Sequence, residues 1–189
     1  TRYLVDNFTI SSILHEYIMS NILANLCDFI HEAQKERGSV VLYLRDSKGE
    51  HSEAIESQFT VVDAISKKLD ALPKHQAGNV PSFLNAVRYL PAKRKYVVAR
   101  MLQPNEALTF YTRDIIAPAI EIAQELSVLD PANNPAKVSA FVNFLHWKER
   151  VGLERALGTQ LVNLNWSQTP DFKSRLEYIV SEQKAYERM

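Results

Sequence analysis

Residues 22–44, ILANLCDFIHEAQKERGSVVLYL, decide the fold. Their apolar residues recur at spacings of three and four, which is the period of one face of an α-helix. This stripe consists of Ile22, Leu26, Ile30, Ala33, Val40 and Leu44. The position between Ala33 and Val40 on the stripe is Arg37, so the pattern predicts an arginine that points into the core. Gly38 follows it inside the helix, where a glycine costs about 1 kcal/mol relative to alanine.

A second amphipathic segment, near residues 136–165, repeats this anomaly. Its stripe consists of Val138, Phe141, Leu145, Thr159 and Val162. The intervening stripe positions are Lys148, Gly152 and Arg155, so a second arginine is predicted to point inward beside a glycine. Glycines next to inward arginines leave room for close helix approach or for a small guest that the two arginines share.

The chemistry of such a guest follows from the guanidinium group. It is a planar fork of donors that stays protonated, so two of them converging on a desolvated cavity suit a small planar oxyanion. Three or four charge-assisted hydrogen bonds, less the costs of desolvation and ordering, predict an affinity on the order of micromolar to millimolar. The alternative is that the inward arginines have a structural role, because a buried arginine often forms an ion pair with a glutamate of its own bundle. Candidate partners are Glu36, Glu149 and Glu154.

The rest of the chain also predicts helices, so the expected fold class is all-α. Five glycines in 189 residues are few, and helix-forming residues fill the segments between turn signals. The expected helices lie near residues 9–45, 51–71, 82–101, 105–129, 136–165 and 171–189. We expect a break around Pro91 and a kink near Pro118. Short connections between long helices favour an antiparallel up-down helical bundle.

Residues 1–189 have the size and composition of a single domain. The first residue, Thr1, and a last segment that is still amphipathic at its end indicate a domain excised from a longer protein, with residues 1–15 as a connecting helix. The 22 basic and 22 acidic residues cancel, so no global charge favours direct binding of nucleic acid. No stretch approaches the roughly 18 apolar residues that a membrane span needs.

Other chemistry has little support in the sequence. The histidines show neither HExxH spacing nor a Glu-x-x-His pair, so we expect no metal site and place His31 and His146 on helix surfaces or at the core edge. Cys27 lies in an apolar stretch, where an inert thiol is expected. Phosphate-binding loops and nucleophile elbows are absent, so we expect neither an enzyme nor a bound cofactor. The basic run Lys93-Arg94-Lys95 is predicted to be a solvated face.

Four ordered blocks of the sequence resemble a single family. They are FIHEAQKERGS at residues 29–39 followed by Tyr43-Leu44, LPAKR at residues 90–94, Phe110-Tyr111-Thr112 with Ile115-Ile116, and KERVGLERA at residues 148–156. The blocks are similar to those of the nitrate- and nitrite-sensing domains, or NIT domains, of bacterial signalling proteins. They span residues 29–156, and a weaker similarity continues over residues 178–186.

The resemblance implies an all-helical sensor, built from four-helix bundles, that binds nitrate or nitrite and signals to an attached output module. The family's arginines correspond to Arg37 and Arg155, with Arg150 as a third. We therefore expect Arg37 and Arg155 to clamp the anion between the first and fifth helices and Arg150 to assist or orient. Gly38 and Gly152 are expected to make the room. A ligand that bridges two helices signals by favouring one of their relative placements.

A second hypothesis belongs to a different class. In it the chain is a structural or dimerisation bundle of a signalling protein, and Arg37 and Arg155 pair with internal glutamates. Added nitrate should then leave the stability of the domain unchanged. A homodimer is an assembly open to either hypothesis. The compartment depends on flanking segments: membrane spans would make this an extracytoplasmic sensor domain, and their absence a cytoplasmic one.

Overall fold

Helices account for nearly all of the structure, and no strand occurs in its described residues. The computed structural model describes residues 2–46, 51–73, 79–129, 134–161 and 170–188. In chain order the elements are α1 (Arg2–Arg45), α2 (Ser52–Ser66), the 3₁₀-helix η1 (Lys67–Ala71), α3 (Val80–Val98), α4 (Pro104–Phe110), the π-helix η2 (Tyr111–Ile116), α5 (Ala117–Leu129), α6 (Pro135–Leu161) and α7 (Pro170–Glu187). The all-α prediction is confirmed, and residues 162–165 of the expected fifth helix lie outside the described residues.

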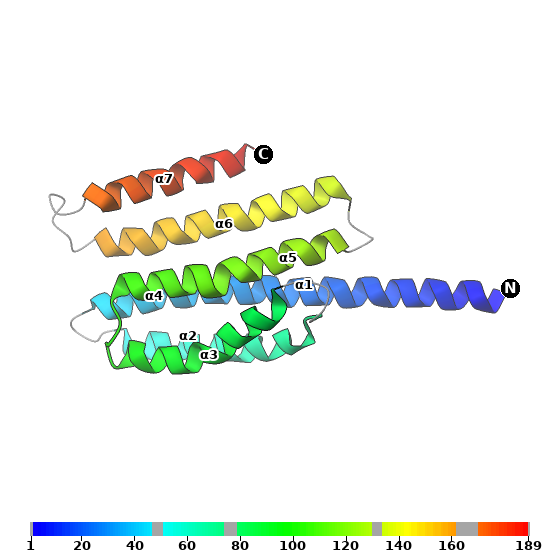
Figure 1. Ribbon diagram of the computed structural model, residues 1–189, viewed down its shortest axis with the longest axis horizontal. Helices are drawn as coiled ribbons and strands as arrows, with labels where there is room; N and C mark the ends of the chain where they lie inside the picture. The colour runs from blue at the N-terminus through cyan, green and yellow to red at the C-terminus, as the bar shows by residue number, and fades with distance from the viewer. Residues whose placement is uncertain (1, 47–50, 74–78, 130–133, 162–169, 189) are drawn as a thin grey trace.

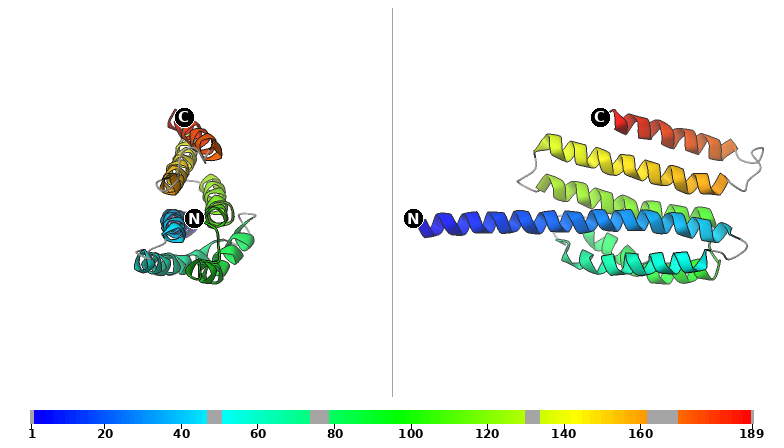
Figure 2. Two further views of the ribbon diagram at one scale, coloured as in Figure 1. Left: turned by 90° about the vertical axis from the view of Figure 1, so that its left-hand side faces the viewer. Right: turned by 180° about the vertical axis from the view of Figure 1, so that it is seen from behind.

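The long helix α1 lies at the centre of the molecule. Successive long helices alternate in direction along the chain, as expected from short connections (Figure 1). α1 contacts α2, α4, η2, α5 and α6, and α7 packs on α6 away from the centre (Figure 2). The N-terminal part of α1 extends beyond the other helices (Figure 1). Within the described ranges, no helix has an apolar stretch long enough to cross a membrane.

Two clusters of buried apolar side chains hold the helices together. The larger cluster joins α1, α2 and α3 to the continuous run of α4, η2 and α5, and inside it Phe29 packs edge-on against Phe83 with ring centroids 5.6 Å apart. The smaller cluster joins α1, α4, α6 and α7 and consists of Val41, Leu108, Leu153, Ala156, Leu157 and Ile179. α1, α4 and α6 therefore contribute to both clusters, α6 through Leu145 in the larger one.

Proline shapes two of the helices. The expected break at Pro91 is wrong, because α3 continues through it and only bends about midway along its length (Figure 1). A proline inside a helix removes one backbone hydrogen bond, and the neighbouring turns can absorb that loss as a bend. The irregularity expected near Pro118 takes the form of η2, in which the N–H of Ala117 bonds the carbonyl of Thr112.

The π-helix η2 provides two of the polar side chains that contact α1. Its consecutive residues Tyr111 and Thr112 both reach α1, where they contact Glu36 and Arg37. A π-helix is rare and frequently occurs at functional sites, because its wider turn redirects side chains. The preceding helix α4 begins with a reciprocal capping box between Gln103 and Glu106, which fixes where this run of helix starts.

Truncation of a central aromatic residue tests the larger cluster. We expect Phe29→Ala to lower the free energy of unfolding by about 3–5 kcal/mol, because Phe29 is fully buried and the change leaves a cavity against Phe83. Tyr89→Ala is the control, since Tyr89 is 52% exposed, and it should cost less than about 1 kcal/mol. Urea denaturation monitored by circular dichroism measures both changes in the free energy of unfolding. Equal losses would contradict this packing.

Candidate functional site

Glu36 of α1 is a completely buried carboxylate with partners from two other helices. Arg94 of α3 donates to it twice, from Nε to Oε1 at 2.8 Å and from Nη2 to Oε2 at 2.7 Å. Tyr111 of η2 donates its hydroxyl to the same carboxylate. Arg94 also donates from Nη1 to Asp63 of α2 at 2.5 Å. These bonds tie α1 to α2, α3 and η2 within the larger cluster.

Arg37, the next residue on α1, is also completely buried and points to α6. Its Nη1 donates to Glu149 Oε1 at 2.5 Å, and its Nη2 donates to Glu149 Oε2 at 3.3 Å. Nη1 also donates to the hydroxyl of Thr112 at 2.9 Å. Gln34, one turn earlier on α1, donates its amide to Glu149 Oε2 at 2.8 Å. The buried Nε of Arg37 has no hydrogen-bond partner among the described residues.

Glu36 and Arg37 are thus consecutive residues of opposite charge on the central helix α1. Successive residues of an α-helix point about 100° apart, so Glu36 and Arg37 face different neighbours. Glu36 faces α3 and η2, and Arg37 faces α6 and the hydroxyl of Thr112. Each buried charge has its counterion on another helix, which is the condition for tolerating it in a core.

Burial and pairing shift the pKa values of the groups around Glu36. Burial raises the pKa of Glu36 above its ordinary value, and the hydrogen bonds from Arg94 and Tyr111 offset only part of that rise. For Arg94, burial lowers the pKa, but the hydrogen bond and charge of Glu36 outweigh this, so the pKa lies above its ordinary value. Burial, together with the neighbouring Glu36 charge, raises the pKa of Tyr111. Arg94 and Tyr111 therefore remain hydrogen-bond donors.

Gly152 of α6 is the position at which Arg37 passes the backbone of the facing helix. A Cβ at residue 152 would lie 2.9 Å from Arg37 Nη2, which is closer than real contacts allow. A Cβ at Gly38 or Gly158 would meet nothing within 4 Å. Gly152 therefore makes room for the guanidinium, whereas Gly38 contributes open space on the adjoining surface.

A pocket of about 510 Å³ opens beside Gly152, between α1 and α6. Its lining, which defines the α1–α6 pocket, is His31, Gln34, Lys35, Gly38, Ser39, Leu42, Gln58, Gly152, Arg155 and Ala156. The structure thus brings Gly38, Gly152 and Arg155 to one cavity. Arg37 lies directly behind its wall, since Arg37 Nη2 touches Gly152. The carboxylate of Glu149 accepts from both Nη atoms of that guanidinium.

Arg155 does not point into the core, so that expectation is wrong. Its side chain is exposed, and it forms no ion pair with any described residue. The face of α6 that is buried runs through Leu145, Glu149 and Leu153 to Leu157, which is rotated from the stripe read in the sequence. The mismatch arises because α6 packs against α1, α5 and α7 at once. Arg155 consequently lies at the mouth of the α1–α6 pocket.

Arg150 lies apart from the other predicted site residues. It forms an ion pair with Glu182 of α7, with Nε and Oε2 3.0 Å apart. It lines a different pocket, bounded by α4, η2, α6 and α7, and it does not line the α1–α6 pocket. Its sequence neighbour Glu149 is nevertheless the partner of Arg37, so Arg150 links that pair to α7.

Several residues of this site were not identified from the sequence. Arg94 was assigned to a solvated basic run, and this was wrong, because its side chain is buried on Glu36 while Lys95 is exposed. Asp63, Tyr111 and Thr112 carried no signal of their own. Arg94, Tyr111 and Thr112 did belong to blocks that resembled the family, and this was the only available indication.

The remaining candidates from the sequence have ordinary roles. His31 is exposed, and the half-buried His146 stacks on Tyr186 with ring centroids 5.4 Å apart. Cys27 is half-buried, and burial raises the pKa of its thiol, which makes it a poor nucleophile. The described part of the chain contains no group of three or more His, Cys, Asp or Glu side chains able to hold a metal ion.

Two glycine substitutions on α6 test the close approach of Arg37 to this helix. Gly158→Ala should stabilise the domain by up to about 1 kcal/mol, because alanine is the better helix former and its Cβ meets nothing. Gly152→Ala should instead destabilise it, by about 1–3 kcal/mol, because its Cβ displaces the guanidinium from Glu149. Urea denaturation of the two variants measures the difference. A stabilising Gly152→Ala would contradict the described position of Arg37.

Comparison with known proteins assigns the chain to a family. Searches of curated proteins and of solved structures found no match. The family described as nitrate and nitrite sensing, NIT, matches residues 28–189, which include every element from the second half of α1 to α7. With most of its length matched, the chain belongs to the NIT family of nitrate- and nitrite-sensing domains.

Proposed function

We propose that this domain binds nitrate or nitrite between α1 and α6 and passes a helix displacement to an attached output module. One observation carries the proposal: the fully buried guanidinium of Arg37 lies behind Gly152 and is bound by a carboxylate, Glu149. Membership of a sensing family supports the ligand class. The remaining argument concerns how such an anion reaches Arg37.

Glu149 is an internal stand-in for the ligand. Nitrate, nitrite and a carboxylate all present a pair of oxygens in one plane, which is the shape that the planar guanidinium fork binds in a bidentate way. The two Nη atoms of Arg37 already hold Glu149 in this manner. An incoming anion therefore competes with Glu149 for Arg37, and binding consists of replacing one anion by the other.

Arg155 supplies the second charge of the proposed clamp. It lies at the α1–α6 pocket with Gly152 and has no carboxylate partner among the described residues, so it is available to a ligand. The pocket is much larger than a three- or four-atom anion. The anion would consequently lie against the wall at Gly152, within reach of Arg37 on one side and Arg155 on the other. Gln34 lines the same wall and offers an amide donor.

The signal follows from the loss of the Arg37–Glu149 pair. That pair links α1 directly to α6, and Arg150, the neighbour of Glu149, is paired with Glu182 of α7. Once an anion releases Glu149, α6 and α7 are free to take a second placement relative to α1. The ligand shifts this equilibrium only by its differential affinity for the two placements. In this scheme Arg150 is a positioning residue rather than a ligand contact.

The second candidate function is a structural bundle without a ligand. The Arg37–Glu149 pair favours it, because it satisfies the buried arginine without any guest. Arg155 does not fit this reading equally well, since an internal partner for it is missing in the described ranges. Experiments on Arg155 and Glu149 distinguish the two functions. Arg37→Ala distinguishes them less well, because it strands Glu149 in the core under both.

Removal of the exposed clamp residue tests binding without disturbing the core. Nitrate or nitrite at one hundred times its Kd should raise the melting temperature by roughly 5–10 °C, while chloride at equal ionic strength should not. Arg155→Ala should weaken this affinity about tenfold or more and leave the ligand-free melting temperature nearly unchanged. Arg88→Ala, on the distant helix α3, is the control. An unchanged nitrate response in Arg155→Ala would contradict the clamp.

Removal of the internal competitor tests the exchange. Glu149→Gln keeps the shape of the side chain but removes its charge, so it should destabilise the ligand-free domain by about 3 kcal/mol, because Arg37 stays buried with no counterion. Nitrate should then bind at least about fivefold more tightly by isothermal titration calorimetry and restore much of the stability. The structural bundle predicts the same destabilisation with no rescue by nitrate.

A further inference from the structure

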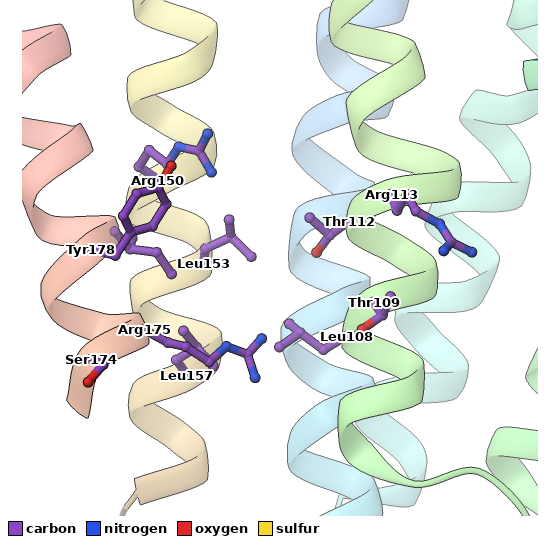
Figure 3. Close-up of a pocket in the computed structure, with 11 residues that line it drawn as sticks. Leu108, Thr109, Thr112, Arg113, Arg150, Leu153, Leu157, Ser174, Arg175 and Tyr178 are labelled. Atoms are coloured by element: carbon purple, nitrogen blue, oxygen red, sulfur yellow. The ribbon is translucent and has the colours of Figure 1, made fainter. Parts of the chain in front are cut away.

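A second cavity lies on the other side of α6, in the angle between α4, η2 and α7 (Figure 3). It measures about 440 Å³, and it shares no lining residue with the α1–α6 pocket. We call it the α4–α7 pocket; its lining is Leu108, Thr109, Thr112, Arg113, Arg150, Leu153, Leu157, Ser174, Arg175, Tyr178 and Ile179. The nitrate clamp does not use this space, although Arg150, the positioning residue of the signalling scheme, is one of its lining residues.

The base of the α4–α7 pocket is apolar. Leu108 of α4, Leu153 and Leu157 of α6 and Ile179 of α7 are four of the six buried residues of the smaller core cluster, and they also line the pocket. Four aliphatic side chains from three helices therefore offer one continuous surface to any molecule in the pocket. Burying such a surface under an apolar group is favourable in proportion to the area covered.

The rim of the pocket is cationic. Its lining includes three arginines and no acidic side chain. Arg113 is paired with Asp114 at 2.7 Å and Arg150 with Glu182 at 3.0 Å, whereas Arg175 forms no ion pair with any described residue. Arg175 extends from α7 across the mouth of the pocket toward Leu108 on α4 (Figure 3). Thr109, Thr112 and Tyr178 place hydroxyl groups in the same lining, and those of Thr112 and Tyr178 are bound to Arg37 and Glu182.

The geometry points to the α4–α7 pocket as a binding site for a small amphipathic organic anion, with a carboxylate on Arg175 and a ring or short alkyl body on the leucine base. A bare inorganic anion would leave the apolar base in water. A neutral apolar molecule would leave the exposed Arg175 without a counterion. Only a ligand with both parts matches the base and the rim. Its lining residues are distinct from those of the α1–α6 pocket, so the site can be tested in the nitrate-free domain.

Methyl NMR tests this site directly. Benzoate, cyclohexanecarboxylate and hexanoate would be titrated into the domain labelled at its leucine and isoleucine methyl groups. Two further probes separate the parts of the ligand: acetate carries only the charge, and benzyl alcohol carries only the apolar body. We expect at least one of the three carboxylates to shift the methyl signals of Leu108, Leu153, Leu157 and Ile179 in a saturable way. Acetate and benzyl alcohol should shift them much less at equal concentration.

Three variants establish where the carboxylate binds. Arg175→Gln should weaken the best probe about tenfold, because it removes a charge-assisted hydrogen bond. Thr109→Trp, at an exposed position on the rim, should fill the pocket and abolish the shifts. Lys173→Gln removes one charge from the same helix outside the pocket and should change the Kd less than twofold.

Three results would overturn the proposal. The first is the absence of saturable methyl shifts with all three carboxylates. The second is an affinity that Arg175→Gln leaves unchanged, or an equal response to benzyl alcohol. The third is a shift of the same methyl signals when the protein alone is concentrated, which would mean that a second copy of the chain covers the pocket. Each result is independent of nitrate, so a failure of the α1–α6 clamp would leave this test intact.

Discussion

Two oppositely charged side chains follow each other on α1, and both are removed from water. Glu36 is held by Arg94 and Tyr111, and Arg37 by Glu149 and Thr112. Because the two residues point about 100° apart, one pair joins α1 to α3 and η2 and the other joins it to α6. The placement of the surrounding helices depends on this double pairing, since either charge without its partner would cost several kcal/mol.

The two pairs differ in how readily an outside anion could replace one partner. Glu36 is enclosed by Arg94, Tyr111 and the side chains of the larger cluster, and it lines neither the α1–α6 pocket nor the α4–α7 pocket. Arg37 adjoins Gly152, a lining residue of the α1–α6 pocket that has no side chain. A buried ion pair contributes little net stability, because desolvation offsets most of its attraction. In the proposed scheme, exchange of Glu149 for another planar anion keeps Arg37 paired but changes which helices are connected.

Much of the fold could be predicted from the sequence, and less of the site. Turn signals located the six long helical segments, and periodicity gave the inward direction of Arg37, because both are properties of a single segment. The burial of Glu36 and Arg94 could not be found in this way, since their partnership joins residues 58 positions apart and Arg94 lies in a run that looks solvated. Glu149 was one of three candidate partners for Arg37, and packing selects it over a separation of 112 positions. Arg155 was misplaced because α6 is packed on several sides, so its stripe did not reveal the buried face.

A crystal structure of the domain with bound nitrate tests the central claim most directly. The account predicts nitrate at the wall formed by Gly152, with its oxygens on the Nη atoms of Arg37 and on Arg155, and with the Glu149 carboxylate displaced from the position it now holds. Nitrate found elsewhere, or bound in this pocket while Arg37 and Glu149 stay paired at their present distances, would contradict the exchange.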